Sequence, residues 1–303
     1  SAGSGFRYGS NAREISMAKA MNTVYNKGYN AFGNPALLSE VENIEYGFSY
    51  FSMSLDRSIQ SFSISRPMPP TASVAFSFLR AGVDDITQTD WSGNEYGNIS
   101  SWEGYGMLSF GNRFGNLSFG LNLKAYKNQL TPEYASDGTG VDLGMIYKIN
   151  NQSKIGLYIN NLSSTYNWKV TYNNSSNQYE QTMPRIVTAG YSYNHLKFLI
   201  SGQLDFFVKD FDLADELLGQ ESTINKYIRL RLGSELNMFE INKMDFYLRF
   251  GLIVDEDNNA FSIGCGVPFN ISESMDMEFN YALDPGFRGE GISHLITFSI
   301  LNY

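Results

Sequence analysis

The stretch YIRLRLGSELNM (residues 227–238) alternates between apolar and polar side chains, and MDFYLRFGLIV (residues 244–254) repeats the alternation after a short break. A period of two residues places the two sets on opposite faces of a β-strand. The runs of 12 and 11 residues are about twice the usual strand length in globular proteins and are close to the roughly 9–11 tilted residues that cross a bilayer. The stretch therefore predicts a hairpin with one face in lipid and the other in water or ion pairs, which is typical of a transmembrane β-barrel.

The composition is compatible with membrane-spanning strands but not with a membrane-spanning helix. The chain has 303 residues, of which 43% are apolar, 15% aromatic and 17% charged. No window holds 18 uncharged apolar residues, so we expect no transmembrane helix. The mean hydropathy of −0.26 suits a barrel, in which only the outward half must be apolar, but it suits a soluble β-rich binding protein equally well.

Charge and motif content narrow the classes of function. The net charge of −9 argues against a nucleic-acid partner, and the single Cys265 excludes an intrachain disulfide and a multi-cysteine metal site. The sequence contains neither the His-Glu-x-x-His of zinc proteases nor the Gly-x-Ser-x-Gly elbow of hydrolases. We therefore expect no enzyme, no catalytic residue and no cofactor. The acids at residues 255–257 could hold a calcium ion, although acids in a tight turn are more often simply solvated.

The alternation recurs along the chain from Ile44 onward, with turn signals between the repeats. We predict fourteen strands, at residues 44–53, 58–66, 71–79, 104–114, 117–127, 140–149, 154–162, 185–194, 196–207, 227–238, 244–254, 259–269, 274–283 and 293–303. An even number is typical of bacterial barrels whose two termini lie on the periplasmic side. The fold class that follows is all-β: a 14-stranded antiparallel transmembrane β-barrel formed by residues 44–303.

The connections between these strands alternate in length. The short ones lie at residues 67–70, 115–116, 150–153, 195, 239–243 and 270–273. The intervening long ones include residues 80–103, 128–139, 163–184 and 208–226. Short turns on one rim and long loops on the other are typical of outer-membrane barrels. The fold of a soluble β-sandwich does not require its short and long connections to be separated in this way.

Residues 1–43 lack the alternation and hold too few apolar residues to fold alone. Because a polar lumen needs partners, we predict that they form an N-terminal plug inside the barrel. We expect Asn34 and Pro35 to order the entry into the first strand. An exported barrel needs a signal peptide, so we interpret Ser1 as the mature end after its removal.

Three short motifs in this region resemble those of a known family. They lie at residues 12–13 (Ala-Arg), 17–20 (Met-Ala-Lys-Ala) and 34–38 (Asn-Pro-Ala-Leu-Leu). Members of the PorV/PorQ family, within the FadL-like barrel superfamily, carry Ala-Arg, Gly-Met-Gly-Gly-Ala and Asn-Pro-Ala-Gly-Leu at similar spacing before the first strand. The chain is similar to that family, although residues 16–19 replace its glycine-rich run. The resemblance implies a 14-stranded barrel with the N-terminal segment folded into the lumen.

Charged side chains share the polar faces of several predicted strands. The expected inward set is Asp205, Arg229, Arg231, Glu235, Asp245, Arg249, Asp276 and Glu278. Buried charges must be paired or hydrated. One interpretation is therefore a lumen filled by paired charges that hold barrel and plug in register, with Arg13 and Glu14 as partners from the plug. The other interpretation is a polar conduit.

The predicted long loops combine acidic and aromatic residues, and residues 210–218 have the pattern of a short amphipathic helix. Aromatic clusters are enriched at binding surfaces. Our candidates for partner binding are Trp91, Trp102, Tyr166, Trp168, Phe211 and Leu217.

The sequence leaves two main hypotheses for function. The first is a non-enzymatic protein of the bacterial outer membrane whose outer loops bind protein partners; the resemblance implies type IX protein secretion. The alternative is FadL-like transport of hydrophobic small molecules through the lumen or a lateral opening. A charged inner wall would obstruct an acyl chain, which favours the loops as the site of function. The expected partners are outer-membrane lipid, lipopolysaccharide, proteins at the outer loops and, for the alternative, a hydrophobic ligand.

Overall fold

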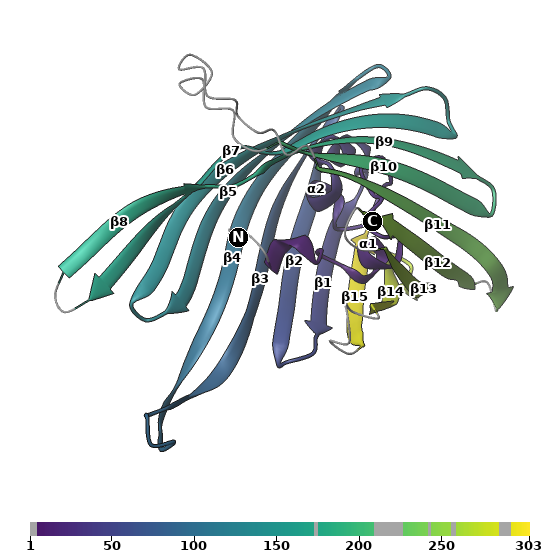
Figure 1. Ribbon diagram of the computed structural model, residues 1–303. Helices are drawn as coiled ribbons and strands as arrows, with labels where there is room; N and C mark the ends of the chain where they lie inside the picture. Colours follow the sequence, from purple (N-terminus) through teal and green to yellow (C-terminus); the bar gives the residue numbers. More distant parts are fainter. Residues whose placement is uncertain (1–4, 173–174, 209–226, 242–243, 256–258, 285–291) are drawn as a thin grey trace, which may run out of the picture.

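A closed ring of antiparallel strands surrounds the N-terminal part of the chain (Figure 1). The computed structural model describes residues 5–172, 175–208, 227–241, 244–255, 259–284 and 292–303. Within these residues, fourteen strands form the ring, and one further strand, β8, pairs with the outer part of β7. The strands are β1 (Ile44–Ser52), β2 (Arg57–Met68), β3 (Ala72–Thr89), β4 (Glu95–Phe114), β5 (Leu117–Thr131), β6 (Tyr134–Lys148), β7 (Ser153–Tyr172), β8 (Ser175–Thr182), β9 (Arg185–His195), β10 (Phe198–Val208), β11 (Tyr227–Ile241), β12 (Met244–Val254), β13 (Ala260–Ser272), β14 (Met275–Asp284) and β15 (Ser293–Asn302).

The two ends of the barrel sequence close the ring by pairing β1 with β15, and the same pairing shows how the faces divide. Phe48 lies opposite Phe298 on the outer face, where both rings are exposed. Their neighbours Ser49 and Thr297 point inward, are buried, and hydrogen-bond to each other at 2.7 Å. Apolar side chains outside and small polar side chains inside are the pattern of a strand between lipid and a polar interior.

All fourteen predicted strands are present, but the long loops predicted at residues 80–103, 128–139 and 163–184 are wrong over most of their length. The long loop predicted at residues 208–226 lies almost entirely outside the described residues. Residues 80–103 continue β3 and β4 as a hairpin that projects well beyond the ring (Figure 1). Its tip closes at Asp90, whose side chain accepts hydrogen bonds from the backbone N–H groups of Ser92 and Asn94. Residues 128–139 likewise extend β5 and β6. The helix predicted at residues 210–218 lies outside the described residues.

Strands β8 and β9 both pair with β7, β8 along its outer part and β9 along its first part. The interruption between them falls at Met183 and Pro184, where proline offers no backbone N–H to the ladder. Side chains bridge the interruption: Asn161 Nδ2 donates to the Pro184 carbonyl at 3.1 Å and Arg185 Nη2 to the Leu162 carbonyl at 3.0 Å. The described part of the predicted loop at residues 163–184 therefore forms a third extension of paired strands.

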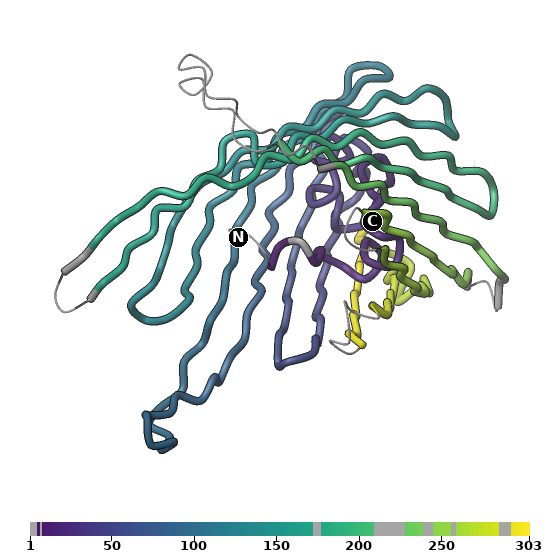
Figure 2. The backbone as a smooth tube through the Cα atoms, in the orientation of Figure 1, coloured from purple at the N-terminus to yellow at the C-terminus, as the bar shows by residue number. Residues whose placement is uncertain are grey.

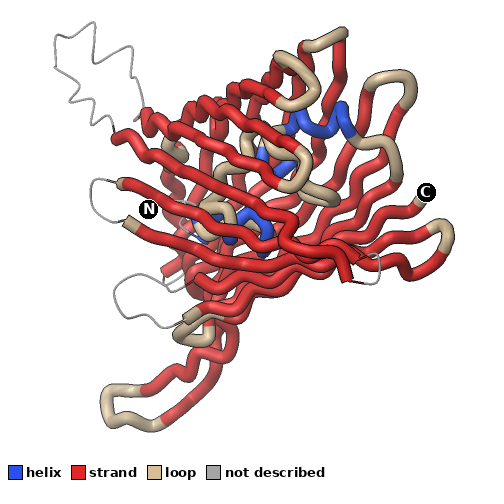
Figure 3. The backbone as a smooth tube through the Cα atoms, turned by 90° about the vertical axis from the view of Figure 1, so that its right-hand side faces the viewer, coloured by secondary structure: helices blue, strands red, loops and turns tan. Residues whose placement is uncertain are grey.

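Residues 5–43, here called the N-terminal segment, lie within the curve of the strands (Figures 2 and 3). The segment contains η1 (Gly5–Arg7), α1 (Ala12–Ser16), α2 (Asn30–Gly33) and η2 (Pro35–Glu40). Helix α1 contacts β12 to β15, whereas η2 contacts β3 to β6 on another side of the ring. Among the described residues, no helix is both long and apolar enough to span a membrane.

Glycines on the inner face of the ring form a groove for this segment. We call it the glycine groove: Gly111, Gly120, Gly144, Gly156, Gly190, Gly233, Gly251 and Gly264. A Cβ atom at Gly120 would lie 2.2 Å from the Ala36 nitrogen, and one at Gly251 would lie 2.3 Å from the Ala18 nitrogen. The backbones therefore approach as closely as they do only because these positions have no side chain.

Candidate functional site

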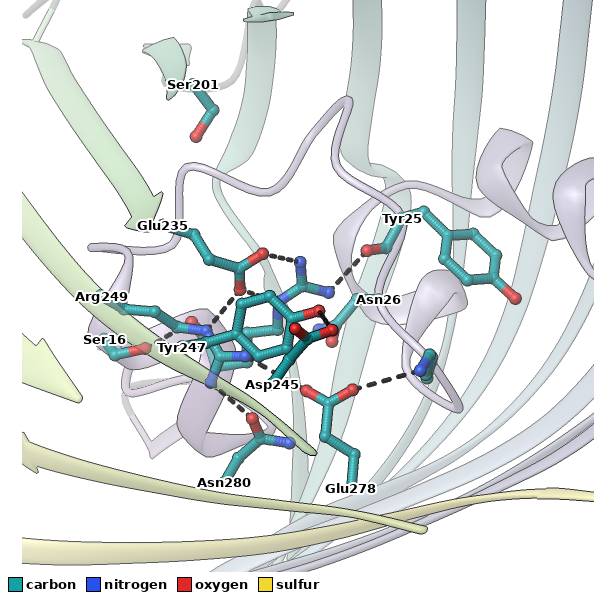
Figure 4. Close-up of polar contacts among 12 residues, drawn as sticks. Ser16, Tyr25, Asn26, Ser201, Glu235, Asp245, Tyr247, Arg249, Glu278 and Asn280 are labelled. Atoms are coloured by element: carbon teal, nitrogen blue, oxygen red, sulfur yellow. Dashed lines mark hydrogen bonds and ion pairs between the residues drawn. The ribbon is translucent and has the colours of Figure 1, made fainter. Parts of the chain in front are cut away.

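A buried ion-pair network occupies the side of the lumen formed by β11, β12 and β14 (Figure 4). Glu235 accepts two hydrogen bonds from Arg13 of the N-terminal segment, both at 2.8 Å, and one from Arg249 Nε at 2.5 Å. Arg249 also lies 3.1 Å from Glu278, whose other carboxylate oxygen is 3.4 Å from Lys27 Nζ. Two arginines and a lysine thus share two glutamates, so each of these charges has a partner of opposite sign, as buried charges require.

A second set of charges lies on the neighbouring strands β10 and β11. Arg231 Nε is 2.6 Å from Asp205, and Arg231 Nη1 donates to the Ala18 carbonyl at 3.1 Å. Asp205 also accepts a hydrogen bond from the Thr188 hydroxyl. Arg229 pairs with Asp255 at 2.7 Å. The acids at residues 255–257, considered above as a calcium turn, thus include one that binds a guanidinium; residues 256 and 257 lie outside the described residues.

Two members of the expected inward set stay apart from these pairs. Asp245 accepts a hydrogen bond from Asn237 Nδ2 at 2.8 Å. Asp276 does not join the network as expected; it accepts a hydrogen bond from the exposed Tyr303 hydroxyl. The reason is its position at one end of the barrel. Asp276 is the second residue of β14, next to the short turn that connects β13 to β14, and water can solvate a carboxylate there.

The four candidate plug residues have different roles in the N-terminal segment. Arg13 reaches the wall, but Glu14 bonds within the segment, accepting from the Ser10 backbone N–H at 2.8 Å and hydroxyl at 2.6 Å. Asn34 caps η2 by accepting from the Ala36 N–H at 3.0 Å, and Pro35 follows as the first residue of that helix. The Asn34–Pro35 pair lies against the glycine groove just before β1.

Lys19 of the N-terminal segment interacts with the second set of charges. Burial lowers the pKa of its ammonium group to about 8; Glu14 partly offsets this, and the guanidinium of Arg231 adds to it. Its Nζ lies 3.7 Å from Glu14. Lys19 therefore lies among charges of both signs, and burial decides the direction of its pKa shift.

Aromatic rings line the other side of the lumen, along β4, β5, β7 and β8. We call them the aromatic ladder: Phe6, Tyr105, Tyr126, Tyr166, Trp168 and Tyr179. Successive ring centroids lie between 4.8 and 6.3 Å apart, within the range of favourable aromatic pairs. Gly138 lies between Tyr126 and Tyr166 in the register of the sheet, which leaves space for the two rings to meet edge to face at 5.2 Å.

The ladder corrects the expectation that Tyr166 and Trp168 are exposed on a partner-binding loop. They are only 1% and 6% exposed, because the β7–β8 hairpin extends the inner face of the barrel outward. Trp102 is half-buried at the base of the β3–β4 hairpin, with the Arg80 guanidinium 5.8 Å from its ring centroid. Trp91 is fully exposed at the tip of that hairpin, so these tryptophans do not share one surface. The other two candidates, Phe211 and Leu217, lie outside the described residues.

The sequence analysis missed one buried pair on the ladder side. Lys124 on β5 and Asp142 on β6 are 2.7 Å apart, and the Tyr158 hydroxyl donates to Asp142 at 2.8 Å. Alternation placed Lys124 on an inward face, but nothing in the glycine-rich sequence around Asp142 indicated its partner. The two charges of this pair compensate each other beside the ladder.

Two cavities lie between the charged side and the ladder. The outer cavity has a volume of about 1200 Å³ and is lined by Trp102, Tyr166, Trp168 and Tyr179 on one side and by Phe207, Phe261 and Arg229 on the other. The inner cavity, of about 160 Å³, is lined by Phe6, Tyr105 and Tyr126. Because Tyr126 lines the inner cavity, Tyr166 lines the outer one and the two rings are in contact, the ladder runs from one cavity to the other.

Comparison with known proteins supports the fold. No protein-family model and no curated protein sequence matches the chain. Among solved structures, the CymD monoaromatic hydrocarbon channel is 13% identical, with 98% of each chain covered and a TM-score of 0.59. The P. putida toluene transporter TodX is 11% identical, covering 97% of this chain and 99% of that one, with a TM-score of 0.63.

A FadL homologue of Pseudomonas aeruginosa is similar over the same length. It is 9% identical, with 96% of this chain and 97% of that chain covered and a TM-score of 0.60. At such low identity, the likeness establishes the fold only. The fold is a closed, 14-stranded antiparallel β-barrel with one extra strand, similar to the folds of these channels and transporters.

Proposed function

We propose that this protein carries hydrophobic small molecules across the bacterial outer membrane, as a non-enzymatic barrel of the FadL-like kind. The names of the similar structures describe channels or transporters of toluene and monoaromatic hydrocarbons. In this chain, the observation that carries the proposal is the aromatic ladder, which gives an apolar surface from the outer cavity to the inner one. The proposal includes export to the outer membrane.

The distribution of charge supports passage along the ladder. Charges across the lumen would obstruct an apolar molecule, because moving past them requires their desolvation. The network around Glu235, however, is confined to β11, β12, β14 and the N-terminal segment, where its members are already paired with one another. An apolar solute on the opposite wall need not disturb them.

The protein-secretion hypothesis, which the PorV/PorQ resemblance implied, has less support. It rested on aromatic residues in outer loops, and Tyr166 and Trp168 instead belong to the buried ladder. Trp91 is the described candidate that remains fully exposed. We therefore favour transport over the binding of protein partners.

The N-terminal segment lies beside the proposed route. Phe6 contributes the innermost ring of the ladder and stands 4.8 Å from Tyr105. We propose that residues 1–43 act as a plug, so that solutes reach the inner cavity along the ladder while water and ions meet a filled lumen.

A matched pair of substitutions tests the function. Trp168→Ser removes a ring from the ladder, and Trp91→Ser makes the same chemical change at an exposed hairpin tip. Uptake of radiolabelled toluene by cells whose outer membranes hold equal amounts of heat-modifiable protein should fall several-fold for Trp168→Ser and stay at the wild-type rate for Trp91→Ser. Equal uptake by all three proteins and by cells without the barrel would refute transport. A defect confined to Trp91→Ser, in retention of a co-purifying protein, would favour the secretion hypothesis.

A further inference from the structure

Two buried polar groups stand beside the aromatic rings of the outer cavity. Tyr166 and Asn128 line this cavity and are only 1% and 3% exposed. Tyr166 Oη and Asn128 Oδ1 are buried without a well-formed hydrogen bond in the described chain, and the two side chains lie next to each other. Asn128 Nδ2 donates to the Ser136 hydroxyl at 2.8 Å, which leaves the amide oxygen as the available end of the side chain.

The register of the sheet brings these atoms next to two rings of the ladder. Asn128 pairs with Ser136, and Ser136 pairs with Trp168 on the next strand. One step further into the barrel, Tyr126, Gly138 and Tyr166 form the corresponding row. The Tyr166 hydroxyl and the Asn128 amide oxygen, here called the notch, therefore lie beside the rings of Tyr166 and Trp168.

We propose that the outer cavity recognises aromatic molecules that carry a hydroxyl group. This inference rests on the proposed function and names its class of solute. The aromatic ring of the solute packs on the ladder, its O–H donates to Asn128 Oδ1, and its oxygen accepts from Tyr166 Oη. Buried polar atoms without a partner are costly, so a solute that satisfies both is bound in preference to one that satisfies neither.

The charges around the cavity select against an anionic solute at this notch. The Glu103 carboxylate lines the same wall and would repel a second carboxylate. The cations that line the cavity already have partners. Arg229 is paired with Asp255 at 2.7 Å and Arg231 with Asp205 at 2.6 Å. Lys19 lies 3.7 Å from Glu14, and Arg57 donates to the Tyr8 hydroxyl at 3.0 Å. A neutral hydroxyl offers the donor that Asn128 Oδ1 needs without adding negative charge.

Three probes that differ at one position of the ring test the proposal: toluene, p-cresol and 4-methylbenzoate. Their affinities are measured by isothermal titration calorimetry with the full chain in nanodiscs, after subtraction of empty nanodiscs. The Tyr166→Phe variant keeps the ring and removes the hydroxyl. It should weaken p-cresol binding about three- to tenfold, the effect of one hydrogen bond, and leave toluene binding unchanged. We expect 4-methylbenzoate to bind the wild type most weakly.

A second variant and a control keep the test decisive. Asn128→Leu removes the acceptor and should produce the same selective loss of p-cresol affinity. Ser109→Ala deletes another buried hydroxyl without a hydrogen bond in the described chain, but one that does not line the cavity, and should change neither affinity. The proposal is overturned if p-cresol does not bind, if both cavity variants affect p-cresol and toluene equally, or if the benzoate binds best. Preferential p-cresol binding without uptake of any probe would contradict the proposed transport alone.

Discussion

Arg13 in the N-terminal segment and Glu235 on β11 are joined by two parallel hydrogen bonds, Nε to Oε2 and Nη2 to Oε1, both 2.8 Å long. The two residues are 222 positions apart in the chain. Glu235 is also the partner of Arg249, so one carboxylate holds two buried guanidinium groups and links the segment to the barrel wall.

Replacing Glu235 by Gln should therefore destabilise the protein strongly. The change leaves Arg13 and Arg249 buried without their shared anion, and breaking a buried ion pair costs about 3–5 kcal/mol. The measurement is the temperature at which the folded band disappears on unboiled gels. Asp84→Asn is the control, because its pair with Arg80 lies at the surface and such pairs contribute about 0–1 kcal/mol. Equal midpoints for the two variants would contradict the role of Glu235.

Alanine in the glycine groove should displace the N-terminal segment. At Gly120, a Cβ atom would lie 2.2 Å from the backbone of residues 35 and 36, whereas at Gly106 on the neighbouring strand nothing lies within 4 Å. We expect Gly120→Ala to make the segment accessible to protease and to raise ion conductance in a planar bilayer. Gly106→Ala should behave as wild type. A Gly120→Ala barrel with normal conductance and a protected segment would show that the close approach is not needed to hold it.

The stability contribution of Lys19 should depend on pH. Burial lowers the pKa of Lys19 to about 8 from the usual 10.5. Between these values, the folded protein binds fewer protons than the unfolded chain, so the stability conferred at this position rises with pH. The thermal midpoint of the wild type, relative to Lys19→Met, should therefore increase from pH 8 towards pH 10.5 and be constant below pH 7. A difference that does not change with pH would mean that Lys19 titrates normally.

A charge on the outer face should be costly near the middle of the bilayer. Leu232 is exposed on the outer face of β11 and pairs with Leu252 on β12. Leu232→Arg should lower the free energy of unfolding by about 2–4 kcal/mol if it lies near the midplane, as measured by urea titration in phospholipid vesicles. Leu232→Met, which keeps an apolar side chain of similar size, is the control. Equal urea midpoints would place this face of β11 away from lipid.

Much of the barrel could be predicted from the sequence. The period of two in residues 227–254 placed Arg229, Arg231 and Arg249 on inward faces, and the same alternation identified all fourteen strands of the ring. Alternation is a local property, because each residue of a strand points opposite to its neighbours whatever the strand pairs with. In the structure Tyr105 and Tyr126 share the parity of buried Met107 and Lys124, but the sequence analysis did not identify these tyrosines as part of a binding surface.

Only the tertiary structure decided which inward residues meet. Arg13 pairs with Glu235, and Tyr166 packs against Tyr126, because ring closure and strand register bring distant segments to the same level along the barrel axis. A period of two fixes the face of a side chain but not its partner across the lumen. For the same reason, turn signals could not show that residues 163–184 continue as paired strands, and this made Tyr166 and Trp168 part of a buried wall instead of an exposed loop.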